Sequence, residues 1–355
     1  QAVRGLKLAT GNACIQFVPT PDGKALFTVE DLKPIKAGAL HPVRDDELHP
    51  VRNDELHPVQ QAMVDCHGSQ CGFCTPGFVM SLWAGYEQHA AQGARPTRQQ
   101  LADELSGNLC RCTGYRPILD AGQRMFDLPA AALDTAPVVA ALRAMQSDAP
   151  LAYAAGGGRF FAPRTRDDLA ALRAQHPKAQ LLAGSTDIGL WINKQFKPLP
   201  DLIYVGAVAE LRRIETRDGE IVIGAGASLE DAWRALARRW QSLTEVWLRF
   251  ASPPIRHSGT MGGNVANGSP IGDSAPVLMA LDAAIELRRG TRTRRMALTD
   301  FYVDYMKNRL EEGEFVQAIV VPALPADRQL RAYKISKRFD CDISALCAGF
   351  AIELD

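Results

Sequence analysis

Four cysteines form two tight pairs, Cys71 with Cys74 in the run CGFC and Cys110 with Cys112 in the run CRC, and no other cysteine lies between the pairs. A disulfide within the CRC run would be badly strained, whereas two thiolates at that spacing can bind one metal centre. Soft thiolate ligands select zinc or iron–sulfur centres over magnesium or calcium. The spacing therefore predicts a shared metal centre and leaves zinc and iron–sulfur both open.

Helices are predicted to hold both pairs, because residues 57–126 have helical periodicity. Val59, Met63 and Val64 give one apolar stripe, and Thr75 followed by Pro76 is typical of an N-cap with proline at the first helical position. The predicted helices after the first are 78–92, one that starts at 96–97 and stops at Gly107, and one that opens at 115–117 and ends near 126.

Each cysteine pair thus lies in a turn just before a helix. The N-terminus of a helix presents unpaired N–H groups and a positive dipole end, which lower the pKa of thiols and stabilise the negative charge of a four-thiolate centre. Arg111 adds a formal positive charge between Cys110 and Cys112. We expect a compact four-helix unit that carries the metal at one end.

The chain changes character after this unit. Residues 128–157 are rich in Ala and Pro, which is typical of a linker between domains, and beyond Phe160 short apolar runs alternate with helical segments. This pattern predicts an α+β or α/β domain. Its clearest predicted elements are strands at 202–205 and 221–223, a helix at 187–194, and a helix at 229–240 capped by Ser228.

Two glycine-containing loops in this second domain have a strand before them and a helix after them. They are 183–187, AGSTD, and 259–264, GTMGGN. Either loop could bring its backbone close to a pyrophosphate, although neither fits the G-x-G-x-x-G or the P-loop pattern, and plain helix capping is the alternative. Asp273 could accept hydrogen bonds from a ribose or could cap the helix that begins near Ser274.

Composition limits the partners of the chain. Its 355 residues suggest two or three domains, and 40 basic against 40 acidic residues remove the electrostatic argument for nucleic acid or an anionic membrane. No apolar run approaches the roughly 18 residues of a membrane span. With four cysteines in the paired motif, we expect a soluble protein of the reducing cytoplasm. Both ends look cut, so we expect a fragment of something longer.

An octad is repeated at residues 41–56, HPVRDDEL followed by HPVRNDEL. Charged octads interrupted by proline have no packing face, and two complete copies are too few for a solenoid. We interpret this stretch as a duplicated loop and not as a histidine metal site.

The cysteine motifs, in the runs CHGSQCGFCTPGF at 66–78 and GNLCRCTGYRPI at 107–118, closely resemble the second 2Fe-2S domain of the xanthine oxidase family of molybdenum hydroxylases. The resemblance implies that Cys71, Cys74, Cys110 and Cys112 ligate one 2Fe-2S cluster. The run GNAC that ends at Cys14 resembles the last ligand of the family's N-terminal 2Fe-2S domain. The other three ligands are absent from this chain, so here we expect Cys14 to be a buried free thiol.

The second domain resembles the family's FAD domain, which implies the vanillyl-alcohol oxidase type of fold. Segment 333–340 resembles a mobile loop beside the flavin where NAD access is controlled. From the residues alone, Phe250 would be an ordinary core aromatic. The resemblance assigns FAD contacts to Leu181, Leu182, Ala183, Gly184, Ser185, Thr186, Asp187 and Ile188, to Phe250, to Thr260, Gly262, Gly263 and Asn264, and to Asp273, Val316 and Lys334.

The organisation implied is multidomain: an all-α four-helix 2Fe-2S domain, an α+β FAD domain, and a ferredoxin-like remnant at the N-terminus. The expected boundaries are 1–40 for the remnant, 41–56 for the insertion, 57–127 for the 2Fe-2S domain, 128–157 for the linker, 158–335 for the FAD domain and 336–355 for the start of a C-terminal flavoprotein subdomain. The molybdopterin domains are absent. This resembles systems in which a large molybdopterin subunit pairs with a small one, in a heterotetramer, although truncation of a single-chain enzyme would look the same.

The activity implied is that of an electron-transfer subunit. Electrons from a partner's molybdenum centre, which oxidises hypoxanthine and xanthine to urate, would pass through 2Fe-2S to FAD and on to NAD. No catalytic acid or base is expected in this chain. Relatives that oxidise aldehydes or N-heterocycles are alternatives. A non-enzymatic metal-binding scaffold with four cysteine ligands is an alternative from a different class.

Overall fold

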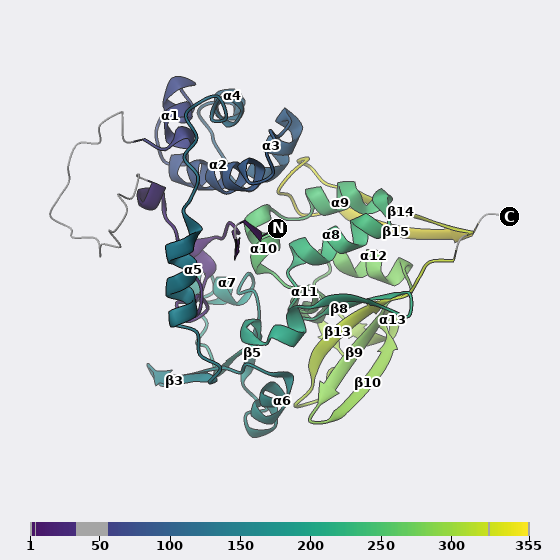
Figure 1. Ribbon diagram of the computed structural model, residues 1–355. Coiled ribbons are helices and arrows are strands. Elements are labelled where there is room, and N and C mark those ends of the chain that lie inside the picture. Colours follow the sequence, from purple (N-terminus) through teal and green to yellow (C-terminus); the bar gives the residue numbers. More distant parts are fainter. Residues whose placement is uncertain (1, 4, 33–55, 326, 354–355) are drawn as a thin grey trace. The chain divides into compact units, whose positions relative to one another are not determined.

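The computed structural model describes residues 2–3, 5–32, 56–325 and 327–353, and the chain forms two compact units (Figure 1). The first unit comprises Gln1–Thr10 and Pro21–Gln146, and the second comprises Gly11–Thr20 and Ser147–Asp355. The octads at 41–56 lie outside the described residues except for residue 56. No helix in the described ranges has both the length and the apolar character that crossing a bilayer requires.

Helices dominate the first unit, and local signals set their ends. His57 and Thr97 each cap a helix in a capping box, with Gln60 and Gln100 as the returning side chains. The expected Thr75 cap is wrong by one residue, since Cys74 is the N-cap and makes no side-chain cap bond. The elements are β1 Ala2–Val3, β2 Leu6–Lys7, η2 Val29–Leu32, α1 Pro58–Asp65, α2 Thr75–Ala90, α3 Arg98–Leu105, α4 Arg116–Arg124 and α5 Thr135–Ala144.

The core of this unit lies where α1 and α3 each pack against both α2 and α4. A Cβ on Gly122 of α4 would lie 3.0 Å from the Leu82 and Leu101 side chains, so the helices approach closely there. Each fully buried side chain of this size contributes about 1.5–3 kcal/mol of hydrophobic stabilisation. The largest fully buried side chains of this unit are Phe78, Leu82, Leu101, Ile118 and Met125.

One helix of the first unit lies within the stretch 128–157 that the composition suggested was a linker. Asp134 accepts a hydrogen bond from the Ala136 N–H at 3.0 Å and caps α5. The alanines that made this stretch look like a linker also favour a helix once a cap is present.

The second unit contains a five-stranded antiparallel sheet in the order β10-β9-β13-β8-β7 and a four-stranded mixed sheet in the order β3-β4-β6-β5. In the smaller sheet β6 pairs in parallel with β4 and with β5, whereas β3 and β4 form a hairpin. The strands are β3 Leu151–Ala155, β4 Gly158–Ala162, β5 Gln180–Leu182, β6 Leu202–Tyr204, β7 Ile214–Arg217, β8 Glu220–Gly224, β9 Ala284–Arg289, β10 Arg292–Ala297, β11 Tyr302–Asp304, β12 Lys307–Asn308, β13 Phe315–Val321, β14 Arg328–Ile335 and β15 Leu346–Glu353.

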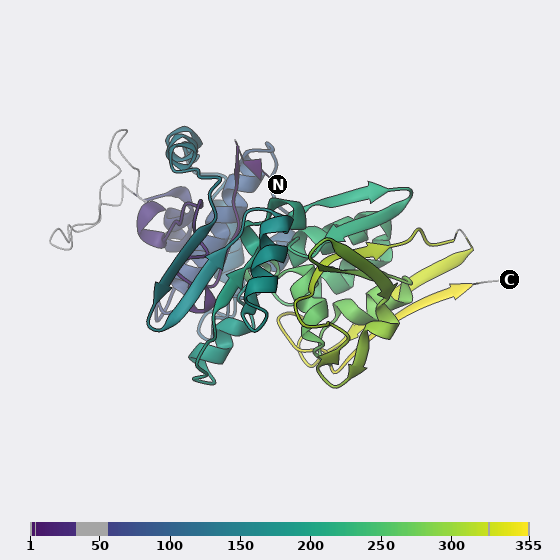
Figure 2. The same ribbon diagram turned by 90° about the horizontal axis from the view of Figure 1, so that it is seen from below.

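Helices α8, α11 and α12 lie on one face of the larger sheet, and their apolar side chains form one buried cluster with β8, β9 and β13 (Figures 1 and 2). The predicted helix at 229–240 is confirmed, since Ser228 accepts from the Asp231 N–H at 3.1 Å. The helices are η1 Ala13–Ile15, α6 Arg166–Gln175, α7 Ile188–Asn193, η4 Val205–Ala207, η5 Ala209–Arg212, α8 Leu229–Arg239, η6 Gln241–Leu243, α9 Thr244–Arg249, α10 Pro253–Ser258, α11 Met261–Asn267, α12 Ser274–Ala280 and α13 Leu298–Phe301.

Candidate functional site

The four predicted cysteine ligands meet in the first unit as two pairs that each combine both motifs. The Cys71 thiol is hydrogen-bonded to that of Cys112, and the Cys74 thiol to that of Cys110. Both motifs lie in turns before helices, as predicted: Cys74 is the N-cap of α2, and the second motif precedes α4. The fold therefore joins the two runs across the helical unit.

Two residues beyond the cysteines shape the second motif. The Cys110 N–H donates to the Tyr115 hydroxyl at 3.2 Å, and Tyr115 itself has a left-handed φ of 67° at the N-cap of α4. The Thr113 hydroxyl and N–H lie 3.1 and 3.4 Å from the Cys110 sulfur. Hydrogen bonds from Thr113 lower the pKa of the Cys110 thiol to about 7. They would equally stabilise a metal-bound thiolate.

The other thiols have different surroundings. Burial raises the pKa of Cys74 to about 11, with the hydrogen bond that Cys74 donates to Cys110 as a further cause. The Phe73 N–H lowers the pKa of Cys71, and the bond to Cys71 raises the pKa of Cys112. One member of each pair therefore loses its proton more readily than the other.

The paired arrangement bears on which centre the thiols fit. A tetrahedral zinc ion needs all four thiolates in one shell, whereas a 2Fe-2S cluster has two irons that each take two thiolates. The crosswise pairs match the two-iron pattern, so the donor set fits a 2Fe-2S cluster.

The first predicted FAD loop, residues 183–187, runs from the end of β5 to the start of α7 in the second unit. A Cβ on Gly184 would lie 2.1 Å from the Ser258 carbonyl oxygen, so only glycine fits beside that backbone. Ser185 has a left-handed φ of 66°, and its buried hydroxyl has no hydrogen-bond partner among the described residues. A buried hydroxyl left in this way is what an anionic ligand would satisfy.

The second predicted loop lies against the first. Thr260 caps α11 by accepting from the Gly263 N–H at 3.0 Å, and a Cβ on Gly263 would be 3.7 Å from that of Ala183. The Asn267 amide donates to Asp187 at 2.9 Å and links the two segments again. The structure thus brings together two glycine loops that were predicted separately. Together with the Ser185 hydroxyl they fit the pyrophosphate of FAD.

Asp273 and Lys334, both predicted FAD contacts, form an ion pair of 2.8 Å whose side chains are each 2% exposed. Ser344 completes the group, because it accepts from the Lys334 ammonium at 2.7 Å and donates to the other Asp273 oxygen at 2.6 Å. Asp273 occupies the N-cap position of α12 but makes no cap bond, so the capping interpretation is wrong. Its carboxylate joins β14 to the start of β15 instead.

Phe250 is buried next to Trp233, with ring centroids 5.8 Å apart, in a turn that two buried side chains hold. Arg256 donates to the Phe250 carbonyl at 2.8 Å and to Glu230 at 2.7 Å. Burial alone would raise the pKa of Glu230, but the charge and hydrogen bond of Arg256 hold it below its ordinary value. The following residue, Ala251, has a φ of 51°, which fixes the direction of this turn.

Two predicted residues lie elsewhere in the fold. Val316 is in β13, within the buried cluster of the larger sheet. Cys14 belongs to the second unit and is exposed, so the expectation of a buried thiol is wrong. None of the eight cysteines, all of which lie in described segments, forms a disulfide.

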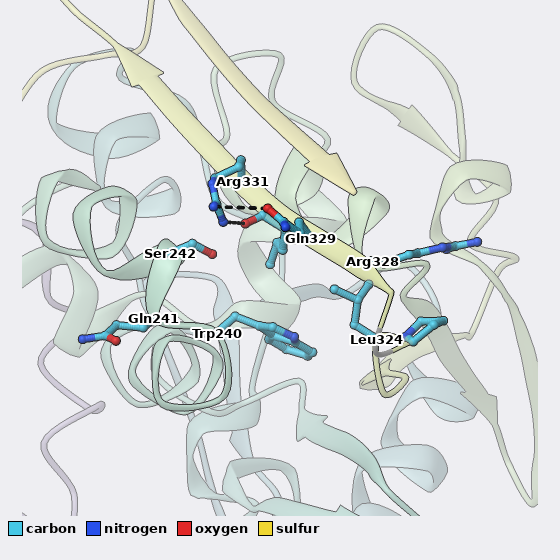
Figure 3. A pocket seen from close by; sticks show the side chains of 9 residues that line it. Trp240, Gln241, Ser242, Leu324, Arg328, Gln329 and Arg331 are labelled. Atoms are coloured by element: carbon cyan, nitrogen blue, oxygen red, sulfur yellow. Dashed lines mark hydrogen bonds between the residues drawn. The ribbon is translucent and has the colours of Figure 1, made fainter. Parts of the chain in front are cut away.

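A surface pocket of about 480 Å³ lies between Trp240 and β14, and none of the predicted site residues lines it (Figure 3). Arg331 is turned onto its own strand, where it donates to Gln329 at 3.4 Å. We assign this pocket no part in the cofactor sites.

Thr113, Ser258, Ser344 and Arg256 were missed as site residues. Thr113 stands in the recognisable run after Cys112 and could have been found from that run. Ser258 directly precedes the predicted second loop, but its contact with Gly184 is tertiary. Ser344 and Arg256 reach the site only through tertiary contacts, and nothing in their local sequence marks them.

Each of the two units contains a segment that matches a known protein family. The profile of the family described as "[2Fe-2S] binding domain" matches residues 47–123, and that of "FAD binding domain in molybdopterin dehydrogenase" matches residues 153–324. Xanthine dehydrogenase of Drosophila subobscura is 30% identical over 403 residues, which cover 97% of this chain, and that of Emericella nidulans is 28% identical over 404 residues. The chain belongs to the xanthine oxidase family.

This chain spans 28% of the length of each of those two xanthine dehydrogenases. Among solved structures, a Cu,Mo-CO dehydrogenase chain is 27% identical with a TM-score of 0.51, covering 55% of this chain and 69% of its own length. Quinoline 2-oxidoreductase from Pseudomonas putida 86, at 21% identity and a TM-score of 0.51 over 55% of this chain and 68% of its own, shares the fold. The chain thus carries the family's 2Fe-2S and FAD binding domains.

Proposed function

We propose that this chain is the electron-transfer part of a xanthine dehydrogenase. The observation that carries the proposal is the pairing of two sites in one chain: crosswise thiol pairs in the first unit, and joined glycine loops with an orphaned Ser185 hydroxyl in the second. When bound, a 2Fe-2S cluster transfers one electron at a time, and FAD connects one-electron transfer with two-electron transfer.

In the first unit the protein would hold the cluster and tune its potential. Cys71 with Cys112 would bind one iron, and Cys74 with Cys110 the other. Hydrogen bonds from Thr113, the start of α4 and the charge of Arg111 favour a more negative centre, and therefore favour the reduced cluster.

In the second unit the two glycine loops would bind the FAD pyrophosphate, with the 183–187 backbone and the Ser185 hydroxyl as donors. Phe250, held by Arg256, would pack on the flavin side, and the Asp273–Lys334 pair would lie beside it. Val316 would contribute from β13. We assign this domain the vanillyl-alcohol oxidase type of fold and keep the boundaries expected from the sequence, 57–127 for the 2Fe-2S domain and 158–335 for the FAD domain. Cys14 is proposed as a cluster ligand only where its three partner cysteines are present.

We infer that electrons come from a molybdopterin-containing partner that oxidises hypoxanthine and xanthine, in a heterotetramer, and leave to NAD. The support is the similarity to xanthine dehydrogenases over nearly the whole chain. Eight free thiols support a reducing cytoplasm as the site of action.

A relative with another substrate is the second candidate. The Cu,Mo-CO dehydrogenase chain is 27% identical over 55% of this chain, compared with 28% over 98% of it for the xanthine dehydrogenase of Emericella nidulans. Because the substrate would bind in the partner, no residue of this chain discriminates between these reactions.

Kinetics of the chain alone test the proposal. With cluster and FAD bound, we expect NADH to reduce an artificial acceptor and xanthine to give no reduction. Turnover of xanthine by this chain alone would contradict the assignment of oxidation to a partner. Failure of NADH to reduce the bound flavin would contradict NAD as acceptor.

A further inference from the structure

The segment Gly11–Thr20 belongs to the second unit, although the residues on both sides of it belong to the first. It contains the short helix η1 and then Gln16, Phe17 and the buried Thr20. The Thr20 hydroxyl donates to the Phe17 carbonyl at 2.7 Å, which closes the segment on itself. We call this segment the strap.

One half of the strap lies on α7, the helix that directly follows the first FAD loop. A Cβ on Gly189 would lie 2.5 Å from the Ile15 carbonyl oxygen, so the strap backbone touches the helix where only glycine leaves room. The Asn193 side chain donates to the Cys14 carbonyl oxygen. Phe17 packs against a buried cluster that includes Leu182 and Ile188, the residues near the two ends of that loop.

The other half of the strap reaches the second loop through Ser258. The Gln16 amide donates to the Ser258 hydroxyl at 2.9 Å. Ser258 is the last residue of α10, its carbonyl lies against Gly184 of the first loop, and it precedes Gly259 and Thr260 of the second. One residue thus meets the strap with its side chain and both loops with its backbone.

These contacts give the strap a role in FAD binding. Ordering a flexible loop when the ligand binds costs conformational entropy and weakens the affinity for that ligand. A loop that is already held in place avoids this cost. We propose that the strap holds the two FAD loops in their binding arrangement, so that FAD affinity depends on Gln16, Ser258 and Asn193. Binding of FAD should in turn change the reactivity of Cys14. This inference rests on the proposed function and makes these three residues positioning residues.

Linkage requires that the effect run both ways. If the strap raises FAD affinity, FAD must hold the strap more firmly by the same factor. Cys14 is exposed and its carbonyl is bound by Asn193, so the rate at which a maleimide modifies Cys14 reports on the strap without any assay of activity.

The experiment measures the FAD Kd of the apo chain by flavin fluorescence, and Cys14 modification by peptide mass spectrometry with and without FAD. We expect Gln16→Ala and Ser258→Ala each to raise Kd by about three- to tenfold, the loss of one hydrogen bond, and the double variant to do no more than either alone. Saturating FAD should slow modification of Cys14 in the wild type, and this protection should shrink in Gln16→Ala.

Asn193→Ala should act in the same direction, and it serves if a Ser258 variant is poorly folded. Gln241→Ala, an exposed amide on η6, is the matched control and should leave Kd unchanged. If the wild type binds FAD but every strap variant binds equally well and Cys14 is not protected, the strap proposal is overturned. If the wild type binds no FAD, it is the proposed function that fails.

Discussion

The two candidate sites differ in how far along the chain their residues come from. All four cysteines and the Thr113 that contacts them lie between residues 71 and 113 in turns before α2 and α4, with three of the thiols partly or fully exposed. The residues that form or support the flavin site come from positions 14 to 344, and the site depends on glycine contacts and on buried ion pairs. We conclude that the cluster site is built from one short stretch of the chain, whereas the flavin site is tertiary and sensitive to distant changes.

The largest expected effect is loss of the cluster from the first unit while the second unit still binds FAD. Cys110→Ser removes a ligand from one crosswise pair, and we expect iron to fall from about two atoms per chain to nearly none while FAD binding is kept. Iron and flavin analysis of the purified protein checks this. Cys66→Ser, in the same motif but outside the four, should keep its iron, and loss of iron from both variants would show that the pairing is not what matters.

The second largest effect is expected at Arg256, the buried arginine that donates to the Phe250 carbonyl. Arg256→Met leaves Glu230 buried without its main partner, and we expect a loss of about 3–5 kcal/mol in the unfolding free energy of the second unit. Urea unfolding measures it. Arg98→Met, which breaks an exposed pair with Asp120 in the first unit, should cost less than about 1 kcal/mol. Equal costs would break the contrast between a tertiary and a local site.

Gly184, at the contact between the first loop and Ser258, should be needed for FAD binding but not for iron binding. Gly184→Ala places a methyl group 2.1 Å from the Ser258 carbonyl, and the loop must shift. Overpacking costs about 1–3 kcal/mol, so the FAD Kd should rise by about five- to a hundredfold with iron content unchanged. Gly290→Asn is the control, because no atom lies within 4 Å of a Cβ there. Tight FAD binding by Gly184→Ala would remove the pyrophosphate assignment.

A smaller change is expected from the hydrogen bonds to the Cys110 sulfur. Thr113→Val removes a hydroxyl 3.1 Å from that sulfur, which should lower the cluster midpoint potential by about 20–60 mV, the equivalent of one hydrogen bond. Redox titration followed by electron paramagnetic resonance measures it. Thr113→Ser should restore the potential, and an unchanged value in Thr113→Val would show that this hydroxyl does not tune the cluster.

The smallest effect is a pH dependence confined to the first unit. Burial lowers the pKa of His57 below 6.5, so between that lowered value and 6.5 the unfolded chain binds more protons than the folded one. The first unit should therefore lose stability as the pH falls through 6.5 and show no such loss above it. Protonation would also remove the Nδ1 acceptor of the Val59 N–H.

His57→Asn keeps an N-cap acceptor and cannot titrate, so its stability should depend less on pH. Urea midpoints for the peptide that spans α1, read by pulsed hydrogen exchange at pH 7.5 and 5.5, compare the two proteins. An equal pH dependence in both would rule out His57 as the cause.

The sequence was most informative where structure is local. Capping residues such as Thr97 and Ser228 marked true helix starts, and the cysteine spacing located a site whose ligands do meet. The crosswise pairing was not predictable, because spacing says nothing about which motif faces which. The meeting of the two glycine loops, and the engagement of Asp273 by Lys334, arise from tertiary packing that no local pattern encodes.

The central claim is that one chain holds a two-iron cluster in one unit and a flavin in the other. An absorption spectrum of the purified chain, with iron, zinc and FAD quantified on the same sample, tests it most directly. We predict about two irons and one FAD per chain, without stoichiometric zinc. Stoichiometric zinc with no flavin would contradict the account and leave the four cysteines as a structural metal site.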